Sequence, residues 1–163
     1  GPERLLAILR TLKQRHIEFE IALLGEQFRS TPKEFEQINR EFSAQLIQFG
    51  YAKSREAYLG FLASADIVLS TALHEFQGLA VLEAVALGCV PVLPNRQVYP
   101  ELFGDQYLYE SHDHNIEKEA SSAVDLIQTV ISDNISVPDV KRFKTTQLLP
   151  NYQKLMNEIS KLS

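Results

Sequence analysis

Short apolar runs alternate along this chain with segments whose apolar residues recur at helical spacing, and this alternation constrains the fold more than any other feature. The apolar runs predict β-strands at residues 17–26, 46–52, 66–71, 90–93 and 107–109. Helices are expected between them, and strands that alternate with helices form parallel sheets covered on both faces. The sequence therefore predicts an α/β fold with a doubly wound parallel sheet.

Spacing and capping residues mark the helical segments. Regularly spaced leucines indicate a first helix around residues 5–12. The segment from Thr31 to Glu34 matches a capping box with proline at the first helical position, which predicts a helix over residues 32–45. Ser54 can cap a third helix. Further helices are expected within residues 72–88, 115–132 and 150–161, the last of them starting at Pro150.

Composition limits the organisation and the partners of the chain. Its 163 residues are 45% hydrophobic and 23% charged, so we expect a single domain with a core over residues 1–163. The formal charge of −5 argues against a surface that holds nucleic acid through its phosphates. The single cysteine, Cys89, is expected in the core and fits a reducing compartment. Since no secretory signal or membrane-spanning run is visible, we expect a cytoplasmic protein without membrane contact.

Two glutamates stand out in the otherwise apolar segment 70–93. The helix expected after Gly78 is apolar on every face except at Glu83, so we expect this carboxylate to be carried into the interior. Burying an unpaired carboxylate costs on the order of several kcal/mol, so donors must surround it. Those donors can belong to a structural ion pair or to backbone N–H groups, or they can be the two hydroxyls of a ligand diol such as ribose.

Glu75 lies in the loop that follows the strand expected at residues 66–71. Taken alone it can be a solvated loop acid. It can also face the same crevice as Glu83, because ligands of open α/β sheets bind at the carboxyl ends of the strands. Gly78 fits a tight loop or a close approach of the backbone to a ligand. The order strand, acid, glycine, apolar helix and second acid indicates a site for a nucleotide-linked hydroxyl compound.

This order of residues resembles the E-x7-E signature of the retaining GT-B glycosyltransferases of group 1 (family 4 type), with Gln77 interrupting the usual Phe-Gly pair. The resemblance implies a Rossmann-like domain, one half of a GT-B fold, in which Glu75 binds hydroxyls of the donor sugar and Glu83 binds the ribose. It implies donor contacts at the helix start, at a second phosphate-side loop and near the base: Phe76, Gln77, Gly78 and Leu79; Gly25 and Glu26; Gly50 and Tyr51. The catalytic candidates are Glu75 and its neighbour His74, for which loop packing is the alternative. No metal or other cofactor is implied beyond the nucleotide-sugar donor.

The flanking sequences resemble a narrower group of this family, the mannosyltransferases that act on queuosine in tRNA, which implies GDP-mannose as the donor. A GT-B enzyme has two such domains, and the resemblance covers one. It therefore implies an N-terminal acceptor domain, and a first strand with phosphate-binding Arg and Lys, ahead of Gly1. We expect the isolated chain to be inactive and tRNA to bind only through the full-length enzyme. The alternatives are a catalytically silent nucleotide- or protein-binding module of the same fold and a GT-B sugar-nucleotide epimerase.

Three other polar segments are candidates for weaker sites. The histidines of His112–His114 can suggest a metal, but no third ligand cluster is visible and a solvated loop is expected. The basic cluster at residues 141–144 is expected to be a solvated face rather than an RNA-binding patch. The segment Tyr99-Pro100-Glu101 can line the crevice or cap the following turn.

Overall fold

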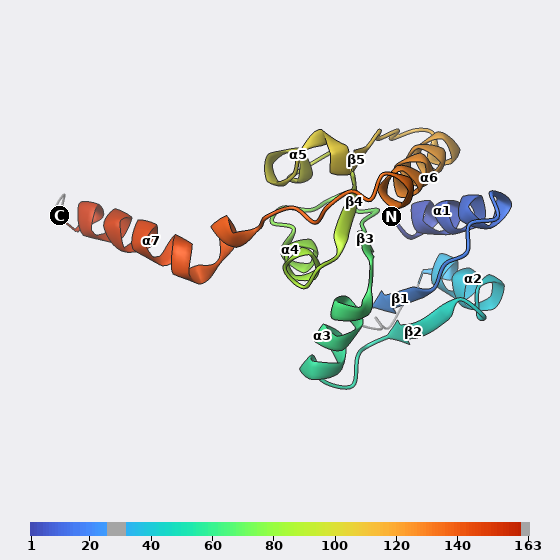
Figure 1. The fold of residues 1–163 in the computed structure, drawn as a ribbon, viewed down its shortest axis with the longest axis horizontal. Helices are drawn as coiled ribbons and strands as arrows, with labels where there is room; N and C mark the ends of the chain where they lie inside the picture. The colour runs from blue at the N-terminus through green and yellow to red at the C-terminus, as the bar shows by residue number, and fades with distance from the viewer. Residues whose placement is uncertain (26–31, 161–163) are drawn as a thin grey trace.

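The computed structural model of the chain describes residues 1–25 and 32–160, in which helices and strands alternate (Figure 1). The helices are α1 (Pro2–Gln14), α2 (Lys33–Glu41), α3 (Arg55–Ser64), α4 (Leu79–Ala86), α5 (Tyr99–Leu102), α6 (Ile116–Ser132) and α7 (Thr145–Ile159). The strands are β1 (Ile21–Leu24), β2 (Leu46–Gly50), β3 (Ile67–Leu69), β4 (Val90–Pro94) and β5 (Leu108–Tyr109). Short 3-10 helices lie at η1 (Asp105–Tyr107) and η2 (Lys141–Phe143).

The strands are parallel and pair in two groups. β1 pairs with β2, and β3, β4 and β5 pair in that order. This arrangement confirms the α/β class and the parallel pairing. The strands form two sheets rather than the single sheet expected, because within residues 1–25 and 32–160 no strand pairs with both β1 and β3. One edge of β3 is therefore unpaired, and its residues are half-buried although a buried strand was predicted.

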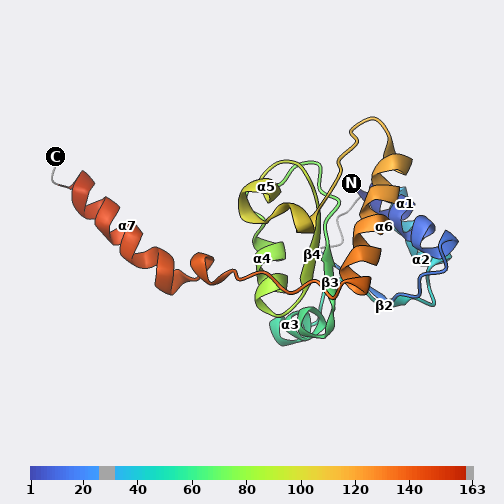
Figure 2. The same cartoon turned by 45° about the horizontal axis from the view of Figure 1, so that its top comes forward.

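Helices cover both faces of the three-stranded sheet, as a doubly wound arrangement requires. Figure 2 shows α4 and α5 on one side of β3 and β4, and α6 on the other side with α1 beside it. The packing of α1 along α6 buries Ile8 and Leu9 of α1 together with Ala123 and Val124 of α6. Each large apolar side chain removed from water contributes about 1.5–3 kcal/mol, so this helix pair holds one face of the core together.

Two prolines interrupt the hydrogen bonds of the buried strand β4. On one side, the N–H of Val90 donates to the carbonyl of Asp66 at 2.8 Å, so the N–H groups of alternate residues of β4 face β3. Pro94 belongs to this set but has no N–H to donate to Ser70. The carbonyl of Ser70 instead accepts the hydroxyl of Tyr109 at 2.8 Å. A side chain thus supplies the donor that the backbone lacks.

Pro91 has the corresponding effect on the other side of β4. Its missing N–H would have faced β5, and the pairing of β5 with β4 begins only at Leu93. Pro94 thus removes one hydrogen bond to the chain after β3, and Pro91 removes one toward β5. Of the strand predicted at residues 66–71, Ile67–Leu69 form β3.

Several element boundaries differ from those predicted. α2 ends at Glu41 rather than at residue 45, and Pro32 is its N-cap rather than its first helical residue, while Thr31 lies outside the described residues. The strand predicted at residues 17–26 is limited to the part that pairs with β2. α7 begins before Pro150 and encloses it, so the prediction that this proline starts the helix was wrong.

α7 extends away from the rest of the molecule (Figures 1 and 2). None of its residues is buried. Its exposed apolar side chains recur at helical spacing along one face: Leu149, Tyr152, Leu155, Met156 and Ile159. No helix within the described ranges is long and apolar enough to cross a membrane.

Candidate functional site

A pocket of about 390 Å³ lies at the carboxyl ends of β1 and β2. It is lined by Leu24, Gly25, Tyr51, Ala52, Ser54, Arg55 and Tyr58. The pocket thus brings together two residues predicted from the sequence, Gly25 and Tyr51. Gly50, also predicted, has φ 95° at the end of β2, a conformation that glycine adopts readily. Carboxyl ends of parallel strands are where ligands of α/β folds bind.

The first turn of α3 forms one wall of this pocket. The hydroxyl of Ser54 caps the helix by accepting the N–H of Ala57 at 3.1 Å, which confirms the predicted cap. Residues three apart on a helix lie on the same face, so Arg55 and Tyr58 are presented together. The guanidinium of Arg55 lies 5.1 Å from the centre of the Tyr58 ring, a cation–π contact. Neither residue was predicted from the sequence to belong to the site.

Glu83 lies beside the pocket because it binds these two residues. Its carboxylate forms an ion pair with Arg55 and accepts the hydroxyl of Tyr58 at 3.2 Å. The ion pair with Arg55, and then the Tyr58 hydroxyl, lower the pKa of Glu83 below its ordinary value, so it is a carboxylate at neutral pH.

The prediction that Glu83 would be carried into the interior was wrong. Its side chain is 38% exposed, because one side of α4 faces solvent. Leu79 and Leu87, at either end of the helix, are exposed as well. Of the donors considered for Glu83, the structure shows the ion pair with Arg55. The pocket beside Glu83 has room for a ligand, so a ligand diol can be a second donor.

Glu75 holds the turn that leads into α4. Its Oε1 accepts the N–H groups of Gly78 at 2.9 Å and Gln77 at 3.1 Å. The Gly78 N–H is the main cause that lowers the pKa of Glu75, with a smaller contribution from Gln77. Gly78 has φ 65°, and a Cβ placed there would lie 2.9 Å from Cδ1 of Leu102 in α5. The left-handed turn therefore favours glycine at this position, and the side chain of Leu102 would have to shift to admit a larger residue.

The start of α4 presents backbone donors that no side chain caps. The first N–H groups of a helix, here those of Leu79 and Ala80, have no partner within the helix. With the helix dipole they favour an anion at this end. Phe76, next to them, is 83% exposed. The backbone N–H groups around the predicted donor contacts thus differ in this structure: those of Gln77 and Gly78 donate to Glu75, whereas no side chain caps the start of α4.

Two predicted site residues are not tied to these features. His74 is exposed, and within the part of the chain that the structure describes it has no hydrogen-bond partner. Glu26 lies outside the described residues. The roles assigned to both remain predictions.

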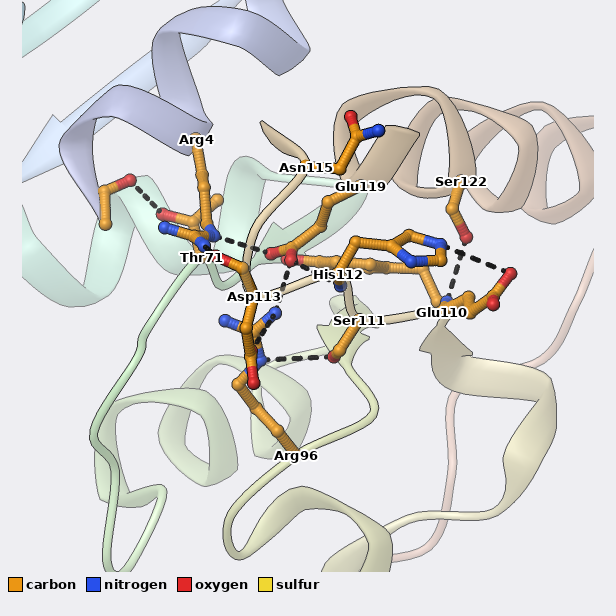
Figure 3. A network of polar contacts seen from close by, with 12 residues as sticks. Arg4, Thr71, Arg96, Glu110, Ser111, His112, Asp113, Asn115, Glu119 and Ser122 are labelled. Carbon is orange, nitrogen blue, oxygen red and sulfur yellow. Dashed lines mark hydrogen bonds and ion pairs between the residues drawn. The ribbon is translucent and has the colours of Figure 1, made fainter. Parts of the chain in front are cut away.

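A buried ion network lies at the carboxyl ends of β4 and β5 (Figure 3). Glu119 of α6 is fully buried, with Oε1 3.1 Å from Nε of Arg4 in α1 and Oε2 paired with Arg96, which follows β4. The N–H of His112, after β5, donates to the same carboxylate at 2.8 Å. One carboxylate thus joins α1, α6 and two strand ends.

This network was not predicted, although the sequence contains a signal for it. Glu119 precedes Ala120 and lies four residues before Ala123 on the buried face of an amphipathic helix. A charge at such a position requires buried partners of opposite sign.

The weaker candidate sites have structural explanations. His112 belongs to the network of Glu119, and the described residues contain no group of three His, Cys, Asp or Glu side chains arranged for a metal ion. Tyr99 is buried and bonds Ser70 at 2.7 Å, so it neither lines a crevice nor caps a turn. In the basic cluster, Arg142 donates to the carbonyl of Leu102 at 2.9 Å. Cys89 is a core residue, as predicted.

Comparison with known proteins adds two findings. The family model described as glycosyl transferases group 1 matches residues 1–146. Among curated proteins, the tRNA-queuosine alpha-mannosyltransferase of Drosophila melanogaster is 42% identical over 111 residues. That alignment covers 68% of this chain but 29% of the relative, so the chain spans less than a third of the relative's length. Since the family model covers nearly the whole chain, the chain belongs to the group 1 glycosyl transferases.

Proposed function

We propose that this chain is the donor-binding half of a retaining glycosyltransferase and binds a nucleotide-sugar. The observation that carries the proposal is the position of Glu83, an ionised and half-exposed carboxylate beside a pocket at the carboxyl ends of β1 and β2. In this assignment Glu83 accepts the hydroxyls of the ribose and the base occupies the pocket beside Tyr51. The start of α4 receives the diphosphate, and Glu75 contacts the sugar.

The proposed chemistry needs no nucleophile and no metal from this chain. The bond from the anomeric carbon to the diphosphate oxygen breaks, and that oxygen keeps the electron pair. The acceptor hydroxyl bonds to the anomeric carbon and passes its proton to the departing diphosphate. Uncapped N–H groups at the start of α4 stabilise the charge that develops on the diphosphate.

The narrower proposal is transfer of mannose from GDP-mannose to queuosine in tRNA, in the cytoplasm. Its support is the 42% identity to a tRNA-queuosine alpha-mannosyltransferase together with the flanking sequences around Glu75 and Glu83. With a net charge of −5, this half is assigned to the donor, and the tRNA is assigned to the rest of the enzyme.

We assign the acceptor domain and one strand to chain that precedes Gly1 in the full-length protein. Two observations favour this assignment. β1 and β3 do not pair within the described residues, which leaves each with an edge that a further strand can join. The carbonyl of Gly1 accepts the hydroxyl of Thr71 at 3.0 Å, so the chain enters α1 next to the end of β3.

Calorimetric titration with GDP, UDP and ADP, alone and as sugar conjugates, tests the donor-binding role. Glu83→Gln should weaken the binding of the nucleotide by about 1–3 kcal/mol, the range for loss of charged hydrogen bonds. Glu75→Gln should spare the plain nucleotide and remove the preference for the nucleotide-sugar. Glu41→Gln, at an exposed ion pair with Arg10 in another part of the molecule, is the matched control. Absence of binding to every nucleotide, or equal losses in all three variants, would overturn the proposal.

A further inference from the structure

Arg55 and Tyr58 belong both to the pocket and to the surroundings of Glu83. Each lines the pocket, and each contacts the carboxylate from α3. Sequence comparison with the E-x7-E signature gives neither residue a role, because both precede the signature in the chain.

We infer that Arg55 and Tyr58 are positioning residues, which hold Glu83 where it recognises the two hydroxyls of a ribose. The inference rests on the proposed function, in which Glu83 receives the ribose. Two residues of α3 would then set the preference for ribonucleotides over deoxyribonucleotides.

Counting acceptor sites supports this role. An ionised carboxylate has about four lone-pair sites on its two oxygens. Arg55 binds Oε1 through Nη2 and donates to Oε2 from Nη1 at 3.4 Å, and the Tyr58 hydroxyl donates to Oε2 at 3.2 Å. The protein therefore supplies one donor to Oε1 and two to Oε2, and one site on Oε1 stays free for a ligand hydroxyl. The second hydroxyl of a vicinal diol takes the place of the long Nη1 contact on Oε2.

The positions of the charges support it as well. A nucleoside diphosphate is an anion, and an uncompensated carboxylate beside it would repel it. Arg55 compensates the charge of Glu83 and leaves part of its acceptor capacity free. The stacking of Arg55 on Tyr58 limits the orientations of the planar guanidinium, so the carboxylate that it binds is fixed too.

The competing interpretation is that the Arg55–Glu83 pair is an ordinary surface ion pair. Such pairs contribute little to stability and nothing to ligand choice. The chain contains a comparable pair for reference: Arg10 binds Glu41 through two hydrogen bonds, at 2.9 and 2.6 Å, and neither residue lines this pocket.

The experiment measures dissociation constants of the 163-residue chain for GDP and for its 2′-deoxy and 3′-deoxy forms by ligand-observed NMR. The quantity compared is the ratio of deoxy to ribo dissociation constants. Wild type should prefer GDP by about tenfold, as expected for a charged hydrogen bond. Glu83→Gln should reduce this ratio to about 1, and Arg55→Gln should reduce it by at least about threefold. Tyr58→Phe should have a smaller effect, and Arg55→Lys should restore part of the loss.

Two further readouts separate positioning from a general effect on the fold. Affinity for each deoxynucleotide should fall less than affinity for GDP, since one of the two hydroxyl contacts is already absent. Arg55→Gln added to Glu83→Gln should change the ratio no further. Arg10→Gln should leave every dissociation constant unchanged.

The outcomes distinguish this inference from the function on which it rests. If Glu83→Gln lowers the ratio and Arg55→Gln does not, the positioning role is overturned and donor binding stands. If Arg55→Gln tightens the binding of GDP, Arg55 competes with the ribose, and the inference is again wrong. If wild type binds no nucleotide at all, the proposed function itself fails.

Discussion

At the scale of single residues, the buried charges are expected to affect the stability of the fold more than the exposed ones. Glu119 is fully buried between Arg4 and Arg96. Burying such a group removes the hydration of all three ions, and their attraction to one another compensates for this loss only while every partner is present.

Replacing Glu119 by Gln keeps the shape of the side chain and removes the buried carboxylate that Arg4 and Arg96 share, so each keeps one more exposed partner, Glu3 or Asp113. We expect a loss of about 3–5 kcal/mol in the free energy of unfolding. Urea denaturation followed by circular dichroism measures it. Glu41→Gln, which breaks an exposed pair, should cost less than about 1 kcal/mol. Similar small losses of the free energy of unfolding in both variants would show that a buried ion pair contributes no more to stability than an exposed one.

Glu75 gives a prediction about pH. Backbone N–H groups of Gly78 and Gln77 lower its pKa in the folded state. Its contribution to stability is therefore present above its unfolded pKa and is lost as the pH falls through its lower folded pKa. At pH 7, Glu75→Gln should cost about 0.5–1 kcal/mol, the lower part of the range for a helix cap. At pH 3 the difference between the two proteins should shrink, and at still lower pH it should disappear.

Denaturation curves at both pH values check the behaviour of Glu75. Glu36→Gln, at an exposed position on α2, controls for general effects of charge. A difference between wild type and Glu75→Gln that does not depend on pH would refute the capping role.

Residue identities at the candidate site could be predicted from the sequence, but their surroundings could not. Glu75 and Glu83 were found from their spacing and their apolar flanks. The exposure of Glu83 depends on which side of α4 remains unpacked, and that is decided by elements distant in sequence. Arg55 was missed for the same reason, because its partner lies 28 residues further along the chain.

At the scale of elements, the alternation of strands and helices was predictable from periodicity, whereas their ends were not. A strand continues only as far as its neighbour supplies partners. Pro91 and Pro94 remove two donors from β4, and β3 and β5 are shorter than their apolar runs. α7 differs in the opposite direction and extends on both sides of Pro150.

The Tyr109 hydroxyl should matter because it replaces a backbone donor. Tyr109→Phe leaves the carbonyl of Ser70 without its side-chain partner, and we expect a loss of about 1–3 kcal/mol in the free energy of unfolding. The cost should be smaller in a Pro94→Ala background, where an N–H returns to β4. A double-mutant cycle by chemical denaturation measures the coupling. Additive effects would show that Pro94 and Tyr109 do not serve the same carbonyl.

At the scale of the whole molecule, the strands of the described residues form two parallel sheets, and the chain spans less than a third of the length of its curated relative. Under the proposed function, the chain alone lacks the surface that holds the acceptor. Holding two reactants together can supply roughly 7–11 kcal/mol of barrier lowering, so its absence should abolish turnover.

We therefore expect the 163-residue chain to bind donor no more tightly than about 100 μM and to transfer no sugar. It should also fail to retain tRNA at physiological salt, given its net charge of −5. Incubation with GDP-mannose and queuosine-containing tRNA, followed by mass spectrometry of the nucleosides, tests the transfer. The full-length protein should form the product under the same conditions. Product from the chain alone would mean that its active site is complete.

Cys89 is a natural probe of local opening in this chain. Its buried thiol lies where α3 ends and β4 begins, and it donates to the carbonyls of Leu62 at 3.1 Å and Ala65 at 3.4 Å. Burial raises the pKa of this thiol, so it is shielded and protonated while the junction is closed. Because the sequence contains no other cysteine, every modification by a thiol reagent records an opening of this one junction. The rate of labelling therefore reports how often α3 separates from β4, without any introduced probe.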